Sequence, residues 1–238
     1  GDHRDLHYPL RRQRQMCIRD RDLGLVPTPL FYYSLHLLKD VQGGMMITGS
    51  HNPPEFNGFK MNIGIETLYG EQIQDLRRLA ESGDFMKGNT GEVKTYDIIP
   101  SYKAMIKERI DIARPVHTVV DAGNGTSSIV APDLLEELGC KVKRLYCESD
   151  GRFPNHHPDP TVEAYIRDLI KTVKEGEFEC GVAYDGDADR IGVVDEKGRI
   201  LWGDQLMILF SRSILSEKKG GTIIFDVKCS QTLEEDVR

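Results

Sequence analysis

The segment Asp185-Gly186-Asp187-Ala188-Asp189 sets three carboxylates between two apolar runs, Gly181–Tyr184 and Ile191–Val194. Both runs are typical of short buried strands. In an extended backbone alternate side chains share one face, so the three carboxylates can converge on one point. Grouped carboxylates repel one another unless a cation joins them, and a hard ion such as Mg²⁺ suits oxygen ligands. The sequence therefore predicts a metal-binding loop between two strands.

Two other structures compete for these residues. A solvated acidic turn between the strands stays open on this segment alone. An EF-hand calcium loop would use the three aspartates as its first ligands and Glu196 as its last. Arg190 stands where that loop needs glycine, however, and the flanking segments read as strands rather than helices. The EF-hand is therefore rejected.

Segments of strand and helix character alternate along most of the chain. Further strands are expected at residues 45–47, 118–120, 141–146 and 222–227, and helices at 28–38, 71–80, 101–110, 134–138, 160–173 and 202–214. This alternation predicts an α/β fold made of consecutive α/β sandwich domains with mixed, largely parallel sheets.

The pattern also predicts where the domains divide. Residues 1–21 have no apolar periodicity and are expected to be disordered or foreign to the fold. A first domain is expected at 22–96, a second with the aspartate loop at 97–199, and the beginning of a third at 200–238.

A second chemical signal is the loop Thr48-Gly49-Ser50-His51-Asn52-Pro53, which follows the apolar run 45–47. Asn52-Pro53 favours a turn, and Gly49 permits unusual backbone angles just before Ser50. A serine on a tight turn after a strand has the geometry of an exposed nucleophile, although on this loop alone a serine that only shapes the turn is the favoured interpretation. Neither the hydrolase motif G-x-S-x-G nor a P-loop is present in the sequence.

Composition excludes several classes of protein. The formal net charge of −7 argues against binding to nucleic acid or to anionic membranes, which need clustered positive charge. No apolar run reaches the length of a membrane span, and no secretory signal is recognised. The five cysteines are scattered, which predicts free thiols in a reducing, cytoplasmic compartment.

Taken together, four motifs resemble the α-D-phosphohexomutase superfamily. They are the serine loop, Asn57-Gly58-Phe59-Lys60, Asp121-Ala122-Gly123-Asn124-Gly125, and the aspartate loop with Arg190. They occur in the family's order and at about its spacing. The segment Val227-Lys228-Cys229-Ser230 is most similar to the bacterial phosphomannomutase/phosphoglucomutase branch.

The resemblance implies a mechanism for these loops. Ser50 would carry a phosphoryl group, donate it to a hexose 1- or 6-phosphate of mannose or glucose, and recover the other phosphoryl group from the hexose 1,6-bisphosphate. Asp185, Asp187 and Asp189, with an oxygen of phosphorylated Ser50, would hold one Mg²⁺.

Roles for the neighbouring residues follow from the same resemblance. Lys60 and Arg190 would bind the transferred phosphoryl group or assist proton transfer. His51 would orient the phosphate or exchange a proton, or else form only a loop-shaping hydrogen bond. Lys228 would face the substrate, and Asp121 and Asn124 would build their loop.

The resemblance also implies that parts of the family's four-domain enzyme are missing. The arginine-bearing loop at the amino end, the sugar-specificity loop and the fourth domain are not recognised, so the 238 residues are expected to bind Mg²⁺ weakly and to show little mutase activity alone. The alternatives are a phosphoglucosamine mutase and an inactive fragment that binds metal or sugar phosphate. The motifs leave the preferred sugar, the general base and the oligomeric state open.

Overall fold

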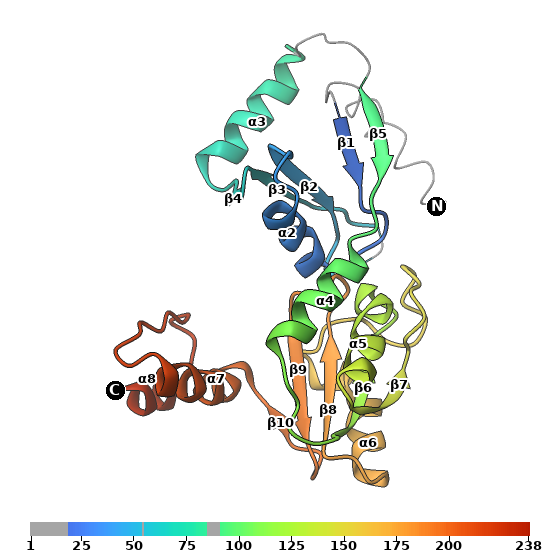
Figure 1. Cartoon of the computed structure of the whole chain (residues 1–238), viewed down its shortest axis with the longest axis vertical. Coiled ribbons are helices and arrows are strands. Elements are labelled where there is room, and N and C mark those ends of the chain that lie inside the picture. The colour runs from blue at the N-terminus through green and yellow to red at the C-terminus, as the bar shows by residue number, and fades with distance from the viewer. Residues whose placement is uncertain (1–18, 54, 85–90) are drawn as a thin grey trace. The chain divides into compact units, whose positions relative to one another are not determined.

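The computed structural model describes residues 19–53, 55–84 and 91–238 (Figure 1). The chain divides into two compact units. The first comprises Gly1–Thr48 and Gly58–Ile106, and the second Gly49–Asn57 and Lys107–Arg238. The serine loop is therefore part of the second unit, although the strands on either side of it belong to the first.

The first unit contains a small antiparallel sheet covered by a helix. Its sheet has the order β2-β3-β4, with β2 at Gly43–Ile47, β3 at Phe59–Ile63 and β4 at Glu66–Thr67. Helix α2, Thr28–Leu37, packs on β2 so closely that a Cβ at Gly44 would lie 2.7 Å from the Phe31 ring and 2.9 Å from Leu35. Glycine at this position therefore allows the helix to approach the sheet.

A separate pair of strands corrects the expected start of the fold. Strand β1, Arg19–Asp22, pairs in parallel with β5, Glu92–Thr95. Residues 19–21 were expected to lack structure, and both strands are polar, so no apolar alternation marks them. Their pairing rests on backbone hydrogen bonds, which leave no pattern in the sequence. The rest of the predicted disordered segment, residues 1–18, lies outside the described residues.

Helix α3, Glu71–Ser82, and helix α4, Ile99–Arg109, complete this part of the chain. Both confirm predicted helices. The end of α4 reaches the second unit, because the division falls after Ile106.

The second unit is built on a mixed five-stranded sheet with the order β10-β9-β8-β6-β7. Strand β6, His117–Asp121, pairs in parallel with β7, Lys141–Leu145, and with β8, Cys180–Tyr184. Strands β9, Ile191–Asp195, and β10, Ile200–Leu201, continue the sheet in antiparallel pairing. The α/β class and the mixed sheets are confirmed. Among the described strands, the parallel pairs are β6 with β7, β6 with β8, and β1 with β5.

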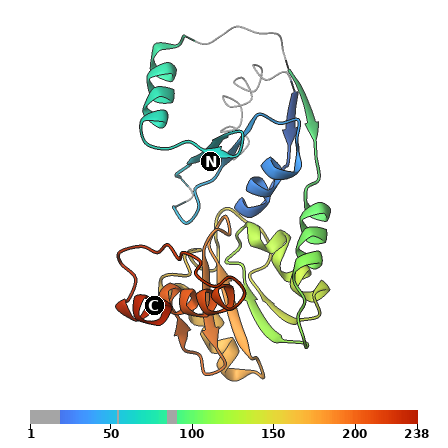
Figure 2. The same cartoon turned by 60° about the vertical axis from the view of Figure 1, so that its left-hand side comes forward.

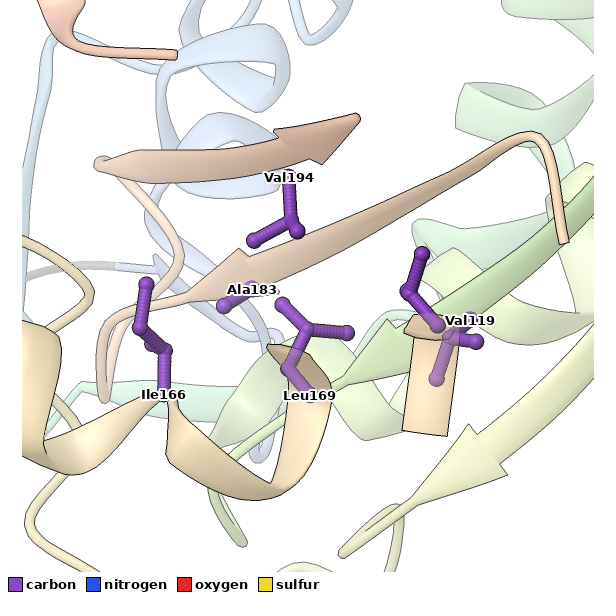
Figure 3. Packing of buried hydrophobic residues seen from close by; sticks show 6 residues of the cluster. Val119, Ile166, Leu169, Ala183 and Val194 are labelled. Atoms are coloured by element: carbon purple, nitrogen blue, oxygen red, sulfur yellow. The ribbon is translucent and has the colours of Figure 1, made fainter. Parts of the chain in front are cut away.

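Four of the described helices in this unit lie between strands along the chain. They are the 3-10 helix η2, Thr126–Ile129, α5, Ala131–Glu137, the 3-10 helix η3, Glu163–Tyr165, and α6, Arg167–Glu175. Helix α6 packs on β6, β8 and β9. Figure 3 shows Leu169 of α6, and Ile166 just before the helix, beside Val119, Ala183 and Val194 of the sheet. This apolar layer fixes the strands whose ends carry the site.

Two expectations for this unit are wrong. The helix expected from residue 160 begins only at Arg167. The Asp159 side chain accepts hydrogen bonds from Thr161 and so closes a short turn, and the 3-10 helix η3 follows this turn before α6 begins. Residues 222–227 form no strand, and Ile224 and Val227 are 87% and 96% exposed. Their β-branched side chains favour a strand, but a strand also needs a neighbour to pair with.

Two helices end the chain. Helix α7, Gly203–Glu217, confirms the predicted helix, and α8, Gln231–Val237, was not predicted. Figure 2 shows the two helices side by side, and Arg212 Nε of α7 lies 3.0 Å from Asp236 Oδ2 of α8.

Two further findings concern the described residues. Within the part of the chain that the structure describes, no helix has both the length and the apolar character needed to cross a membrane. Cys140, Cys147, Cys180 and Cys229 are free thiols, as predicted, and Cys17 lies outside the described residues.

Candidate active site

The serine loop presents Ser50 in a left-handed backbone conformation, with φ of 51°. The loop turns by a hydrogen bond from Asn52 N to the carbonyl of Gly49, 2.9 Å long. The unusual backbone angle was expected at Gly49, but the structure places it at Ser50 itself. Gly49 is needed for a different reason, because a Cβ there would lie 2.9 Å from the carbonyl oxygen of Phe56 across the loop.

The hydroxyl of Ser50 points to the aspartate loop. Its Oγ donates a hydrogen bond of 2.7 Å to Oδ2 of Asp185, which lies 135 residues later in the chain. Both residues belong to the second unit. The structure therefore brings together the two chemical signals of the sequence, within one compact body.

The aspartate loop joins β8 to β9 by a turn. Ala188 N donates to the Asp185 carbonyl over 3.1 Å, and Ala188 has a φ of 59°. One carboxylate oxygen from each of Asp185, Asp187 and Asp189 lies within 4.8 Å of the others. The carboxylates converge as expected, but they do so through a turn and not through an extended backbone.

The electrostatics of the loop favour a cation. Asp185 is fully buried, and its Oδ1 accepts 3.0 Å hydrogen bonds from the backbone amides of Asp189 and Arg190. Burial raises the pKa of Asp185 to about 6, the charges of Asp187 and Asp189 add to that rise, and the Ser50 hydroxyl and the Arg190 amide oppose it. A divalent cation at these oxygens would remove the repulsion, so the donor set fits a hard metal ion.

His51 lies between Ser50 and Arg190. Its Nδ1 is 3.4 Å from Ser50 Oγ, and its Nε2 is 3.4 Å from Arg190 Nη1. Because a guanidinium can only donate, Nε2 must accept, and in the neutral ring the proton then lies on Nδ1, facing Ser50. The direction of donation runs from Arg190 through His51 and Ser50 to Asp185.

Two glycines allow the loops to touch. A Cβ on Gly186 would lie 2.2 Å from the carbonyl oxygen of Ser50, closer than real atoms approach. A Cβ on Gly125 would lie 2.8 Å from the carbonyl oxygen of Gly186. That same carbonyl accepts from Thr126, over 2.9 Å from the amide and 3.2 Å from Oγ1. Gly186 is thus packed between the serine loop and the loop that follows β6.

The predicted site residues fall into two groups. Ser50, His51, Arg190 and the three aspartates lie together in the second unit. Lys60 lies on β3 in the first unit, where its Nζ donates to Thr28 Oγ1 over 3.2 Å. Lys228 follows the segment wrongly predicted as a strand, its side chain is 83% exposed, and its ion pair among the described residues is with Asp226 at 3.5 Å. Lys60 thus belongs to a different unit from the group, and the described contact of Lys228 is with Asp226.

The segment 153–160, which lies beside the aspartate loop, was not predicted from the sequence to belong to the site. Its residues, Phe-Pro-Asn-His-His-Pro-Asp-Pro, combine three prolines and two histidines with almost no apolar periodicity. The Phe153 ring lies 3.5 Å from the position of a Cβ on Gly186. Burial opposes ionisation of Asp159, but the hydrogen bonds from Thr161 outweigh it and lower the pKa of Asp159, with a smaller contribution from the charge of Arg190. The density of prolines and histidines was the available signal.

Comparison with known proteins matches both halves of this arrangement. The family model for phosphoglucomutase/phosphomannomutase α/β/α domain I matches residues 16–86 of this chain, and the family model for domain II matches residues 100–198. The chain belongs to the phosphoglucomutase/phosphomannomutase family. This confirms the predicted relation to the α-D-phosphohexomutase superfamily.

Individual relatives agree with the family. The chain is 49% identical over 212 residues to a phosphomannomutase/phosphoglucomutase of Pseudomonas aeruginosa, and 43% identical over 214 residues to a phosphoglucomutase of Neisseria gonorrhoeae. Each match covers 89% of this chain and 45% or 46% of the relative. The chain thus spans about half the length of the curated relatives it matches.

A solved structure agrees as well. A phosphoglucomutase/phosphomannomutase family protein of Burkholderia thailandensis superposes with a TM-score of 0.90 at 39% identity. The superposition covers 94% of this chain and 50% of the other.

Proposed function

We propose that this chain carries the phosphoryl-transfer centre of a hexose-phosphate mutase, an isomerase that interconverts hexose 1-phosphate and hexose 6-phosphate of mannose or glucose. One observation carries the proposal: the 2.7 Å hydrogen bond between the hydroxyl of Ser50 and Asp185, a member of a three-carboxylate cluster. A serine that only shapes a turn has no need of such a cluster. The named activities of the relatives support the same reaction.

We propose that Asp185, Asp187 and Asp189 hold one Mg²⁺, with an oxygen of phosphorylated Ser50. All three donors are hard carboxylate oxygens, and the site offers neither a thiolate nor an imidazole in the cluster that the structure describes. When bound, the ion would offset negative charge on the phosphoryl group during transfer.

The proposed reaction conserves its phosphoryl groups and its protons. A hydroxyl oxygen of the hexose phosphate bonds to the phosphorus on Ser50, and the bond from phosphorus to Ser50 Oγ breaks. The sugar hydroxyl loses one proton in this step, and Ser50 Oγ gains one. The resulting hexose 1,6-bisphosphate then returns its other phosphoryl group to Ser50 by the reverse steps. Sugar phosphates are the proposed substrates, and neither nucleic acid nor membrane is a proposed partner.

The residues near Ser50 have supporting roles in this proposal. His51 keeps its Nδ1 proton toward Ser50 and can orient the phosphoryl oxygens or exchange a proton with them. Arg190 holds His51 in that tautomer and supplies positive charge beside the transferred group. Lys60 is proposed to bind the phosphoryl group, and Lys228 the substrate, as the family resemblance implies.

We also propose the domain assignment that the sequence predicts. Residues 22–96 would belong to the family's domain I, 97–199 to domain II, and 200–238 to the beginning of domain III. Since the chain spans about 45% of its relatives, phosphorylation of Ser50, rather than rapid turnover of sugar, is the activity proposed for these 238 residues.

The intact mass of the protein tests the proposal. The chain is incubated with glucose 1,6-bisphosphate and Mg²⁺, and we expect a gain of one phosphoryl group. Ser50→Ala should show no gain, while Ser213→Ala, which removes an exposed serine of α7, should behave as the unmodified chain. A chain that gains no phosphate would support a noncatalytic metal- or sugar-phosphate-binding module instead. A Ser50→Ala variant that still gains phosphate would show that another residue carries the phosphoryl group.

A further inference from the structure

A buried ion pair outside the candidate site joins β6 to the segment 153–160. Asp121 ends β6 and is fully buried, and the His156 side chain is 13% exposed. Nε2 of His156 lies 3.1 Å from each carboxylate oxygen of Asp121. Buried charges are stable only when they are paired and hydrogen-bonded, so this contact has a large effect on the geometry around it.

Both ring nitrogens of His156 face acceptors. Nε2 faces the Asp121 carboxylate, and Nδ1 lies 2.9 Å from the carbonyl oxygen of His157. A ring with two acceptors satisfies both only when it carries two protons, which makes it a cation. Burial opposes this charge, but the hydrogen bond and the charge of Asp121 outweigh it, with a smaller contribution from Asp168, and the pKa of His156 rises above its usual value.

The ion pair connects two loops that both reach Gly186. The loop after β6 runs from Asp121 to Thr126, and Thr126 donates two hydrogen bonds to the Gly186 carbonyl. The segment 153–160 sets the Phe153 ring near Gly186. A second tie, from Asn155 Nδ2 to Asn124 Oδ1 over 2.7 Å, lies beside the first.

The segment 153–160 also fits closely over the sheet. A Cβ on Gly123, which has a φ of 51°, would lie 3.1 Å from the His156 ring and 3.2 Å from Pro158. A Cβ on Gly192, in β9, would lie 2.8 Å from Pro160. Segment 153–160 therefore packs near Gly186 at the beginning of the aspartate loop and near Gly192 after its end. His156 lies in the middle of this segment.

We infer that His156 is a positioning residue for the metal-binding loop. Its ion pair with Asp121 joins segment 153–160 to the loop after β6. These two segments together fix the position of Gly186, and with it the positions of Asp185 and Asp187 on either side. This inference deepens the proposed function, since it rests on the aspartate loop being a metal site. It does not require Ser50 to be phosphorylated.

Affinity for Mn²⁺ alone tests the inference. His156→Gln keeps a donor for Asp121 but cannot carry the charge or hold both acceptors, and we expect the Mn²⁺ dissociation constant to rise about 10-fold, the lower end of what the loss of an outer-shell partner costs. His157→Gln is the matched control, because the His157 ring contacts Tyr165 and forms no ion pair among the described residues. Its affinity should stay within about twofold of the unmodified chain. Unchanged Mn²⁺ affinity in folded His156→Gln would overturn the inference.

A spectroscopic measurement separates positioning from a general effect on folding. In the ¹⁵N-labelled chain at neutral pH, we expect both ring nitrogens of His156 to carry protons, as its two acceptors require. A neutral His156 would contradict the inference. If His156→Gln does not fold, Asp121→Asn serves in its place: it should make His156 neutral and speed amide exchange at residues 186–190, and unchanged exchange there would count against the pair. Failure of Ser50 phosphorylation would leave all these outcomes unaffected, so the two proposals fail separately.

Discussion

Ser50 is held in a conformation that its own side chain does not favour. A left-handed backbone at a residue other than glycine costs on the order of 1–3 kcal/mol and persists only where the surroundings enforce it. Here the enforcing contacts are the hydrogen bond to Asp185 and the packing of the Ser50 carbonyl against Gly186. The strain directs the hydroxyl to the carboxylate cluster.

Replacing Gly186 tests this packing. In Gly186→Ala the added Cβ would lie 2.2 Å from the Ser50 carbonyl, and the neighbouring atom is backbone, so the serine loop must move. We expect Mn²⁺ affinity and the rate of Ser50 phosphorylation each to fall about 10-fold or more. Titration calorimetry and intact mass measure the two effects.

Gly203→Ala provides the control for that substitution. Gly203 begins α7 and has no atom within 4 Å of an added Cβ, so both quantities should stay unchanged. A Gly186→Ala chain that phosphorylates at the normal rate would show that the close packing has no role.

At this scale the residues that stand out by their chemical type could be predicted as site residues from the sequence, but the residues that support them could not. Ser50 could be predicted as a nucleophile, and Asp185 and Asp189 as metal ligands, because a serine on a turn and closely spaced carboxylates can be recognised from residue type and spacing alone. Lys228 could not be placed, because its position depended on a strand that does not form. His156 was missed because a buried ion pair shows itself only when distant segments meet.

Among the elements, three parallel strands decide where the site lies. Strands β7, β6 and β8 run in one direction, so their carboxyl ends share one edge of the sheet. The segment 146–160, the loop 121–126 and the aspartate loop follow these three ends. Binding sites in open α/β sheets form at this edge, where loops from neighbouring strands diverge. The alternation of strands and helices predicted the strands of this edge, but it did not predict which of the loops meet there.

The packing of α6 on this sheet yields a prediction of stability. Leu169 is fully buried between α6 and the strands. We expect Leu169→Ala to lower the free energy of unfolding by about 2–5 kcal/mol, because it removes apolar contacts and leaves a cavity. Urea denaturation measures the change. Lys171→Ala on the exposed side of the same helix should stay within about 0.5 kcal/mol, and an equal loss in both variants would be inconsistent with this core.

The beginning of β8 yields a prediction of pH dependence. Arg114 Nη1 donates a hydrogen bond of 2.8 Å to Glu179 Oε1, and the backbone amide of His117 donates to the same oxygen. These hydrogen bonds lower the pKa of Glu179 from 4.5 to about 2. The folded pKa lies below the unfolded one, so this contribution is complete above pH 4.5 and is lost as the pH falls through about 2.

We therefore expect Glu179→Gln to be less stable than the unmodified chain above pH 4.5, with the difference vanishing as the pH approaches 2. Urea midpoints across this range measure it. A difference that stays constant with pH would show that the pair with Arg114 does not form.

Elements that lack a pattern of their own escaped prediction. Strands β1 and β5 are polar, and α8 is a short helix whose amino end is capped by Ser230, which accepts from Thr232 N over 3.2 Å. Residues 222–227 show the opposite error, since local propensity without a pairing partner does not make a strand.

For the molecule as a whole, the chain path matters more than the domain boundaries. The polypeptide passes from the first unit to the second at residues 48 and 49 and back at 57 and 58, where Thr48 N donates to the Gly58 carbonyl over 3.0 Å. Ser50 and its carboxylates thus share one compact unit. The predicted boundary at 96 and 97 lies just before α4, and the division by compactness falls within that helix. Apolar patterns in the sequence predict which segments enter a core, but within one continuous helix they do not show where one unit ends and the next begins.

The ³¹P spectrum of the phosphorylated chain during addition of Mn²⁺ tests most directly whether Ser50 carries a phosphoryl group at a metal site. We expect one phosphoserine resonance that substoichiometric Mn²⁺ broadens, and we expect it to stay sharp at the same Mn²⁺ concentration in Asp187→Asn. A phosphoserine resonance that stays sharp while Mn²⁺ is bound, or a phosphate carried by a residue other than Ser50, would contradict this expectation.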